Sequence, residues 1–128
     1  MAQILIANDN PDLLDCCQSI LEGEGHVVRA VADGERAMAM ALEWQPDVVV
    51  MDYVMPGTDG PTAIAALRAS PATANVPILL MSGTDGTAAS ASRFGADAYL
   101  RKPFEAEQLV AAVARLLAVT DRAARGNG

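Results

Sequence analysis

The chain has 128 residues, of which 52% are hydrophobic and 20% charged, and its formal net charge at pH 7 is −7. This length and composition predict a single globular domain with a buried core and exclude a disordered chain. The negative charge argues against direct binding of nucleic acid or of an anionic membrane, because phosphate recognition requires clustered Lys and Arg.

The start of the chain and its cysteines indicate where the protein resides. Residues 3–7 have the pattern of a strand rather than of a signal peptide, and no apolar run reaches the length of a membrane span. Cys16 and Cys17 are adjacent in a helical pattern, so no disulfide between them is expected. Cys17 is predicted to lie in the core. Reduced thiols fit the cytoplasm, and we expect a cytoplasmic protein without membrane contacts.

Five short apolar segments are predicted to be strands. They cover residues 3–8, 26–31, 47–52, 76–82 and 97–101. Runs of Val, Ile and Leu of this length are typical of parallel strands that are buried on both faces.

The first predicted helix lies between the first two strands. It begins at Asn10-Pro11, where a capping residue is followed by proline at the first helical position. It is expected to end at Gly23 or Gly25, since glycine commonly terminates helices.

The second and third helices also have sequence signals at their ends. The second runs over about 33–44 and is stopped by Pro46. The third starts after Gly60 and ends before Pro71.

The last two helical segments differ in strength. Residues 83–95 are rich in Gly, Ser and Thr and predict only a short, weak fourth helix. Apolar residues recur at helical spacing over 109–117 and predict a strong fifth helix. Residues 121–128 lack a core pattern and are expected to form a frayed tail, which leaves one domain over 1–120.

Strict alternation of strands and helices predicts the fold class. It favours an α/β protein of the (βα)5 type, a doubly wound five-stranded parallel sheet with right-handed crossovers and helices on both faces. No repeat or second domain is visible in the sequence.

Four of the apolar segments end on polar residues of different chemistry. Asp9, Asp52, Ser82 and Lys102 follow ILIAN, VVVM, ILLM and AYLR, and Lys102 is the only lysine of the chain. Ligands of open parallel sheets bind beyond the carboxyl ends of the strands, so we expect these four side chains to share one site.

Paired carboxylates such as Asp9 and Asp52 serve general acid–base catalysis, metal binding, or a nucleophile beside a metal ligand. The metal hypothesis is favoured, because Mg²⁺ prefers one or two carboxylates together with water and phosphate oxygens. A hydroxyl and an ammonium beside such a cation would suit a phosphoryl-transfer site in which Asp acts as the nucleophile.

The chain resembles a response-regulator receiver domain, the flavodoxin-like phosphoacceptor module of two-component signalling. The motifs ILIANDN, VVVMDYVMPGTDG, ILLMSG and GADAYLRKPF carry the resemblance, which spans roughly 3–118. It implies a five-stranded parallel sheet of strand order 2-1-3-4-5.

The resemblance also implies roles for the site residues. Asp52 would be the phosphoacceptor, and Asp9 would bind Mg²⁺ directly, together with Asp52 and the backbone carbonyl of Val54. Ser82 would form a hydrogen bond with the phosphoryl group, and Lys102 would pair with its charge.

Further implications concern switching and one departure from the family pattern. Ser82 and Tyr99 would act as switch residues, and the peptide bond between Lys102 and Pro103 would be cis. Asn8 stands where the family usually has a second acid that reaches the cation through water. An amide can still accept that hydrogen bond, but one negative charge is lost, so weaker Mg²⁺ binding is expected.

The function implied is a phosphorylation-controlled switch. A sensor histidine kinase or phosphotransfer protein would phosphorylate Asp52 with Mg²⁺, and the face of the fourth helix, fifth strand and fifth helix would signal to a downstream protein or output domain. The domain would catalyse only its own phosphorylation and dephosphorylation, so it is not expected to be an enzyme. A homodimer is left open, as are a stand-alone receiver and a fragment of a longer regulator.

Three other functions have less support in the sequence. A pseudo-receiver, a protein-interaction module that works without phosphorylation, is favoured only by Asn8. A phosphohydrolase of the haloacid dehalogenase type would need a second Asp two residues after Asp52, where this chain has Val54. A flavin-binding flavodoxin is disfavoured because residues 8–11 are acidic and lack a phosphate cradle.

Overall fold

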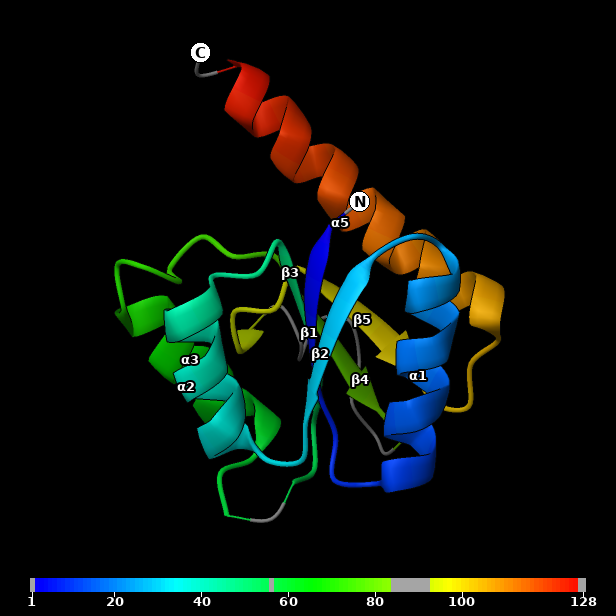
Figure 1. Cartoon of the computed structure of the whole chain (residues 1–128). Helices are drawn as coiled ribbons and strands as arrows, with labels where there is room; N and C mark the ends of the chain where they lie inside the picture. Colours follow the sequence, from blue (N-terminus) through cyan, green and yellow to red (C-terminus); the bar gives the residue numbers. More distant parts are fainter. Residues whose placement is uncertain (1, 56, 84–92, 127–128) are drawn as a thin grey trace.

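The computed structural model describes residues 2–55, 57–83 and 93–126, and shows a central sheet between two layers of helices (Figure 1). The strands are β1 (Gln3–Ala7), β2 (Val27–Val31), β3 (Val48–Asp52), β4 (Ile78–Ser82) and β5 (Ala98–Arg101). All four pairings are parallel, and the order is β2-β1-β3-β4-β5. The predicted fold and strand order are therefore confirmed.

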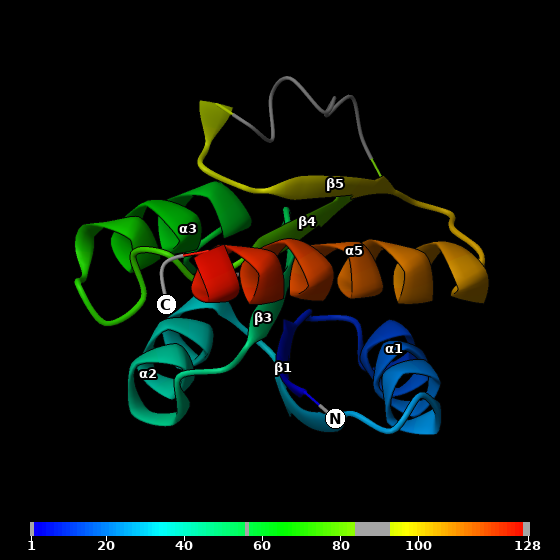
Figure 2. The ribbon, with the colours of Figure 1, turned by 90° about the horizontal axis from the view of Figure 1, so that it is seen from above.

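The described helices are α1 (Pro11–Gly23), α2 (Gly34–Trp44), α3 (Gly60–Ala69) and α5 (Ala106–Gly126). α2 and α3 cover one face of the sheet, and α1 and α5 cover the other (Figures 1 and 2). The weak fourth helix predicted over 83–95 falls mainly on residues 84–92, which lie outside the described residues. None of the described helices is long and apolar enough to cross a membrane.

Side-chain caps define the starts of three helices, and the sequence predicted the first of these caps, Asn10. The Asn10 side chain accepts hydrogen bonds from the backbone N–H groups of Asp12 and Leu13. Asp33 caps α2 and Asp59 caps α3 in the same manner. These acceptors satisfy backbone donors that a helix leaves unpaired in its first turn.

Two apolar clusters hold the layers together, one on each face of the sheet. Because successive strand residues point to opposite faces, β1 and β3 supply alternate side chains to each cluster. Ile4 and Ile6 pack with Cys17 of α1 and Val113 of α5, whereas Leu5 belongs to the cluster with α2 and α3. Burial of Cys17 confirms its predicted place in the core.

The last helix is longer than its apolar pattern indicated. The helix α5 continues through Gly126, and the frayed tail expected over 121–128 stays a prediction. The residues Ala and Arg over 122–125 are strong helix formers, so local propensity continues the helix where the apolar pattern has stopped. In Figure 1 this last part of α5 extends beyond the sheet.

Candidate functional site

The carboxyl end of the sheet brings together the polar residues that follow β1 and β3. Asp52 is the last residue of β3, and the register pairs Ala7 with Met51. Asn8 therefore lies beside Asp52, and both side chains are buried, with exposed fractions of 1% and 4%. The backbone N–H of Asn8 also donates to the carbonyl of Val31, which continues the pairing with β2.

β4 and β5 bring the other two predicted site residues to the same end of the sheet. Ser82, the last residue of β4, pairs in register with Arg101, and Lys102 follows directly. The backbone N–H of Lys102 donates to the carbonyl of Ser82. Ser82 is buried.

An ion pair joins the sole lysine to the predicted phosphoacceptor. The Lys102 Nζ lies 2.5 Å from an Asp52 carboxylate oxygen. Burial raises the pKa of Asp52 above its ordinary value, while the hydrogen bond and charge of Lys102 act in the opposite direction. The negative charge of Asp9 adds a smaller upward effect on the pKa of Asp52, so Asp9 lies within electrostatic reach.

Asp9, Asp52 and the loop that contains Val54 offer donors of the kind that Mg²⁺ takes. Asp9 is exposed and follows Asn8 directly, and Val54 is two residues beyond Asp52. Two carboxylates and a backbone carbonyl are hard oxygen ligands, and Mg²⁺ completes such a set with water. No group of three or more Asp, Glu, His or Cys side chains that could hold a metal occurs within the described residues. The residues present thus fit a hydrated Mg²⁺ ion better than an all-protein cage.

The orientation of Asn8 is a finding that the sequence could not provide. Its Oδ1 accepts a hydrogen bond of 2.9 Å from the backbone N–H of Asn10. Its Nδ2 is buried and has no hydrogen-bond partner in the described part of the chain. The Asn8 side chain therefore has its acceptor, Oδ1, directed at Asn10 and its donor, Nδ2, directed away from Asn10.

Two predicted features belong to β5 and to the residues directly after it, namely the cis peptide bond before Pro103 and the switch residue Tyr99. The peptide bond between Lys102 and Pro103 is cis, as the resemblance implied. Tyr99 is half-buried and packs against the cluster on the α2 and α3 face, whereas Asp52 continues the other face of β3. The switch role of Tyr99 thus stays a prediction.

The loop after β3 depends on a close backbone approach at Gly60, which sequence reasoning missed. The N–H of Gly60 donates to the carbonyl of Tyr53, and a Cβ on Gly60 would lie 2.4 Å from the backbone oxygen of Asp52. Gly57 has a φ of 78°, which L side chains rarely adopt. A close approach of this kind leaves no signal in a single sequence.

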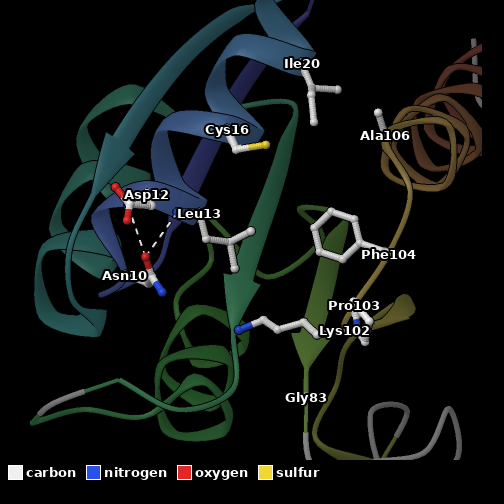
Figure 3. Close-up of a pocket in the computed structure, with 10 residues that line it drawn as sticks. All are labelled: Asn10, Asp12, Leu13, Cys16, Ile20, Gly83, Lys102, Pro103, Phe104 and Ala106. Carbon is white, nitrogen blue, oxygen red and sulfur yellow. Dashed lines mark hydrogen bonds between the residues drawn. The ribbon is translucent and has the colours of Figure 1, made fainter.

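A pocket of about 770 Å³ adjoins the site (Figure 3). Leu13, Cys16 and Ile20 of α1 form one wall, and Phe104 lies opposite them. The Lys102 side chain runs along the pocket toward the end of β3. The helical spacing of the three α1 residues predicts a shared side, but nothing in the sequence places Phe104 across from them.

Comparisons with known proteins agree with this architecture. Residues 4–114 match the family of the response regulator receiver domain. Over 124 residues the chain is 37% identical to the DNA-binding dual master transcriptional regulator RpaA of Synechocystis, and the match covers 95% of this chain and 52% of RpaA. Over 120 residues it is 35% identical to the protein PilH of Pseudomonas aeruginosa, with 92% of this chain and 99% of PilH covered.

Solved structures give the same result. The chemotaxis protein CheY4 of Vibrio cholerae has a TM-score of 0.85 to this chain at 28% identity, covering 91% of this chain and 99% of CheY4. The chain spans about half the length of RpaA and of the mycobacterial DNA-binding response regulator MtrA, but nearly all of PilH. Sequence, fold and strand order agree, and the chain belongs to the response regulator receiver domain family.

Proposed function

We propose that this receiver domain accepts a phosphoryl group on Asp52 from a sensor histidine kinase or a phosphotransfer protein, with Mg²⁺ bound. The observation that carries the proposal is the buried carboxylate of Asp52 at the end of β3, paired with Lys102 and close to Asp9. A cytoplasmic location forms part of the proposal, since the kinase or phosphotransfer domain that donates the phosphoryl group would lie in the cytoplasm in that scheme.

The proposed step is an in-line displacement at phosphorus. An Asp52 carboxylate oxygen attacks the phosphoryl group of a phosphohistidine, and the new O–P bond forms as the P–N bond breaks. The imidazole nitrogen leaves with the electron pair and takes a proton from solvent. Lys102 already contacts the nucleophile, and its ammonium would offset charge on the phosphoryl oxygens.

Mg²⁺, held by Asp9, Asp52 and the Val54 carbonyl, would supply further positive charge to the phosphoryl oxygens. Asp9 and Asp52 are two like charges in electrostatic contact, and a cation between them would relieve that repulsion. The residues themselves contribute position and charge, which are the main sources of catalysis in phosphoryl transfer. The domain then modifies only itself, so we do not assign it an enzymatic activity toward other molecules.

The phosphorylated state would signal through the face that contains β5 and α5. A phosphoryl group adds negative charge and three acceptor oxygens next to Ser82, and Tyr99 sits on the neighbouring strand. We propose that these residues shift the populations of two states of that face, to which residues 84–92 would also contribute. The recipient would be a downstream protein or an attached output domain, and a homodimer is compatible with either.

Intact mass spectrometry tests the proposal. The full chain is incubated with acetyl phosphate and Mg²⁺, alongside Asp52→Ala and Asp59→Asn. The wild type and Asp59→Asn should each gain one phosphoryl mass, because asparagine can still cap α3, and Asp52→Ala should gain none. An adduct on Asp52→Ala would place the phosphoacceptor elsewhere. No adduct on any protein would favour a pseudo-receiver that binds partners without phosphorylation.

A further inference from the structure

Asn8 stands beside the nucleophile and on the same face of the sheet. Residues at the same register in neighbouring parallel strands point the same way, and Ile6 and Val50 lie in one cluster with α1 and α5. Two residues further on, Asn8 and Asp52 continue that face. Both residues are buried, so neither side chain is freely solvated by bulk water.

The hydrogen bond from Asn10 determines which atom of the Asn8 amide is left free to bind another group. The Oδ1 of Asn8 accepts from the backbone N–H of Asn10, and a flipped amide would instead place its NH₂ group against that donor. Nδ2 therefore points away from Asn10, with both of its hydrogens unpaired in the described part of the chain. A buried donor without a partner is unfavourable and indicates a ligand that arrives later.

The chemistry of a donor selects among the groups that could arrive. A water molecule bound to Mg²⁺ directs its lone pair at the cation and presents hydrogens outward, so it needs acceptors. Nδ2 offers only hydrogens. A phosphoryl group presents three acceptor oxygens and is the complementary partner.

We infer that Asn8 is a phosphoryl-binding residue, whose Nδ2 donates a hydrogen bond to a phosphoryl oxygen on Asp52. This inference rests on the proposed function. It assigns Asn8 to the phosphoryl group and removes it from the set that supports the cation through water. The Nδ2 donor would strengthen binding of the phosphoryl group. The same substitution of an amide for an acid removes one negative charge that would otherwise favour the metal.

The amide resonance of Asn8 tests the inference directly in the full-length wild-type chain. The chain is labelled with ¹⁵N-asparagine, and the Asn8 signals are assigned by their loss in Asn8→Ala. Spectra are recorded in chelator, with Mg²⁺ alone, and with Mg²⁺ and acetyl phosphate, while mass spectrometry of the same samples reports the adduct. The exposed amide of Asn75 serves as the control.

We expect one Asn8 Nδ2 proton to shift downfield and to exchange more slowly only when the phosphoryl adduct is present. An unchanged signal despite a complete adduct would overturn the inference and leave the proposed function intact. A full shift with Mg²⁺ alone would overturn it as well, by assigning the amide to the metal. Absence of any adduct would overturn the proposed function and this inference with it.

Calorimetric titration of Mg²⁺ in the absence of phosphodonor gives a second, independent readout. Asn8→Ala should bind Mg²⁺ within about twofold of the wild type, because Nδ2 does not support the cation, whereas Asn8→Asp should bind about tenfold more tightly through its added charge. A loss of Mg²⁺ affinity well beyond twofold in Asn8→Ala would contradict the inference, since it would show that the amide supports the cation.

Discussion

Two adjacent cysteines show how much the environment of a side chain changes its chemistry. Cys16 is exposed and lies on the wall of the pocket beside Lys102, whereas Cys17 is fully buried against the sheet. Burial raises the pKa of the Cys17 thiol to about 11, and the neighbouring Cys16 adds to that increase. Because the thiolate is the nucleophile, Cys17 is unreactive near neutral pH.

We therefore predict that a thiol reagent such as Ellman's reagent modifies one cysteine per native chain at pH 8 and both in denaturant. The native reaction should disappear in Cys16→Ser and persist in Cys17→Ala, provided that circular dichroism shows the latter to be folded. Two thiols of equal reactivity in the native wild type would contradict the environment described for Cys17.

The same pair illustrates what a sequence predicts about single residues. Helical spacing placed Cys17 in the core, because the apolar side of a helix follows from the sequence alone. The wall opposite Cys16 could not be predicted, since Phe104 reaches it through the packing of α5 on α1. The direction of the Asn8 amide depends likewise on a backbone N–H two residues away, and the sequence predicted only its position.

At the scale of elements, Arg68 connects α3 to the start of β4 and to the segment before β5. Its guanidinium donates to the carbonyls of Ala74, Val76 and Gly95 and pairs with Asp97 at 2.8 Å. Asp97 also accepts from a backbone N–H at the start of β4. The planar fork of Arg can serve this many acceptors at once, which an ammonium cannot.

Arg68→Ala is expected to lower the free energy of unfolding by about 2 kcal/mol, because it leaves partly buried carbonyls without their guanidinium donor and removes the ion pair with Asp97. Arg68→Lys should recover only part of the loss. Arg36→Ala is the matched control, since Arg36 forms a surface ion pair with its side chain 74% exposed, and it should change stability by less than about 0.5 kcal/mol. Urea unfolding measures all three, and an equal effect of both alanine variants would contradict this account of Arg68.

Gly60 links the start of α3 to the backbone of the phosphoacceptor. We predict that Gly60→Ala destabilises the fold by about 1–3 kcal/mol, because a Cβ would clash with the backbone of Asp52 and Tyr53. Phosphorylation from acetyl phosphate should also slow, since the strand end that holds the nucleophile must shift.

Gly23→Ala provides the control for Gly60. A Cβ at Gly23 meets no atom within 4 Å at the end of α1, so alanine should be neutral or stabilise by up to about 1 kcal/mol. Chemical denaturation and the time course of adduct formation are the measurements. A Gly60→Ala protein with unchanged stability and rate would show that the loop absorbs the methyl group.

Elements were predictable from sequence where a local signal defines them. A capping residue predicted the start of α1, and apolar runs placed each strand within two residues of its observed bounds. The continuation of α5 to Gly126 was not predicted, because an apolar pattern indicates packing and says little about a helix that continues without it. Gly60 was missed because the contact that requires it lies across the loop.

At the scale of the whole molecule, the fold buries the carboxylate of Asp52, and burial disfavours its charged form. The sheet and helices shield the Asp52 carboxylate, and this burial raises its pKa although Lys102 partly offsets the effect. The folded state therefore holds the Asp52 proton more tightly than the unfolded state, whose aspartate pKa is about 3.9. The associated stability is present below that value and is lost as pH rises through the raised pKa of the folded state.

Asp52→Asn removes this dependence, which leads to a prediction for stability against pH in Mg²⁺-free buffer. The melting temperature of the variant, relative to that of the wild type, should rise as pH increases from about 4 and should level off above the raised pKa. At pH 7 the variant should be more stable by a few degrees, which is equivalent to about 1 kcal/mol.

Asp59→Asn should show the opposite trend, because hydrogen bonds with Thr62 lower the pKa of Asp59. The wild type then gains its advantage over Asp59→Asn at neutral pH and loses it as pH falls through the Asp59 pKa. Thermal unfolding of the three proteins across this range, extended below pH 4 for the comparison with Asp59→Asn, is the measurement. A wild type that melts at a higher temperature than Asp52→Asn at pH 7 without metal would contradict this account. It would show that the ion pair with Lys102 stabilises the charged Asp52 by more than burial destabilises it, so that the nucleophile does not lower the stability of the fold.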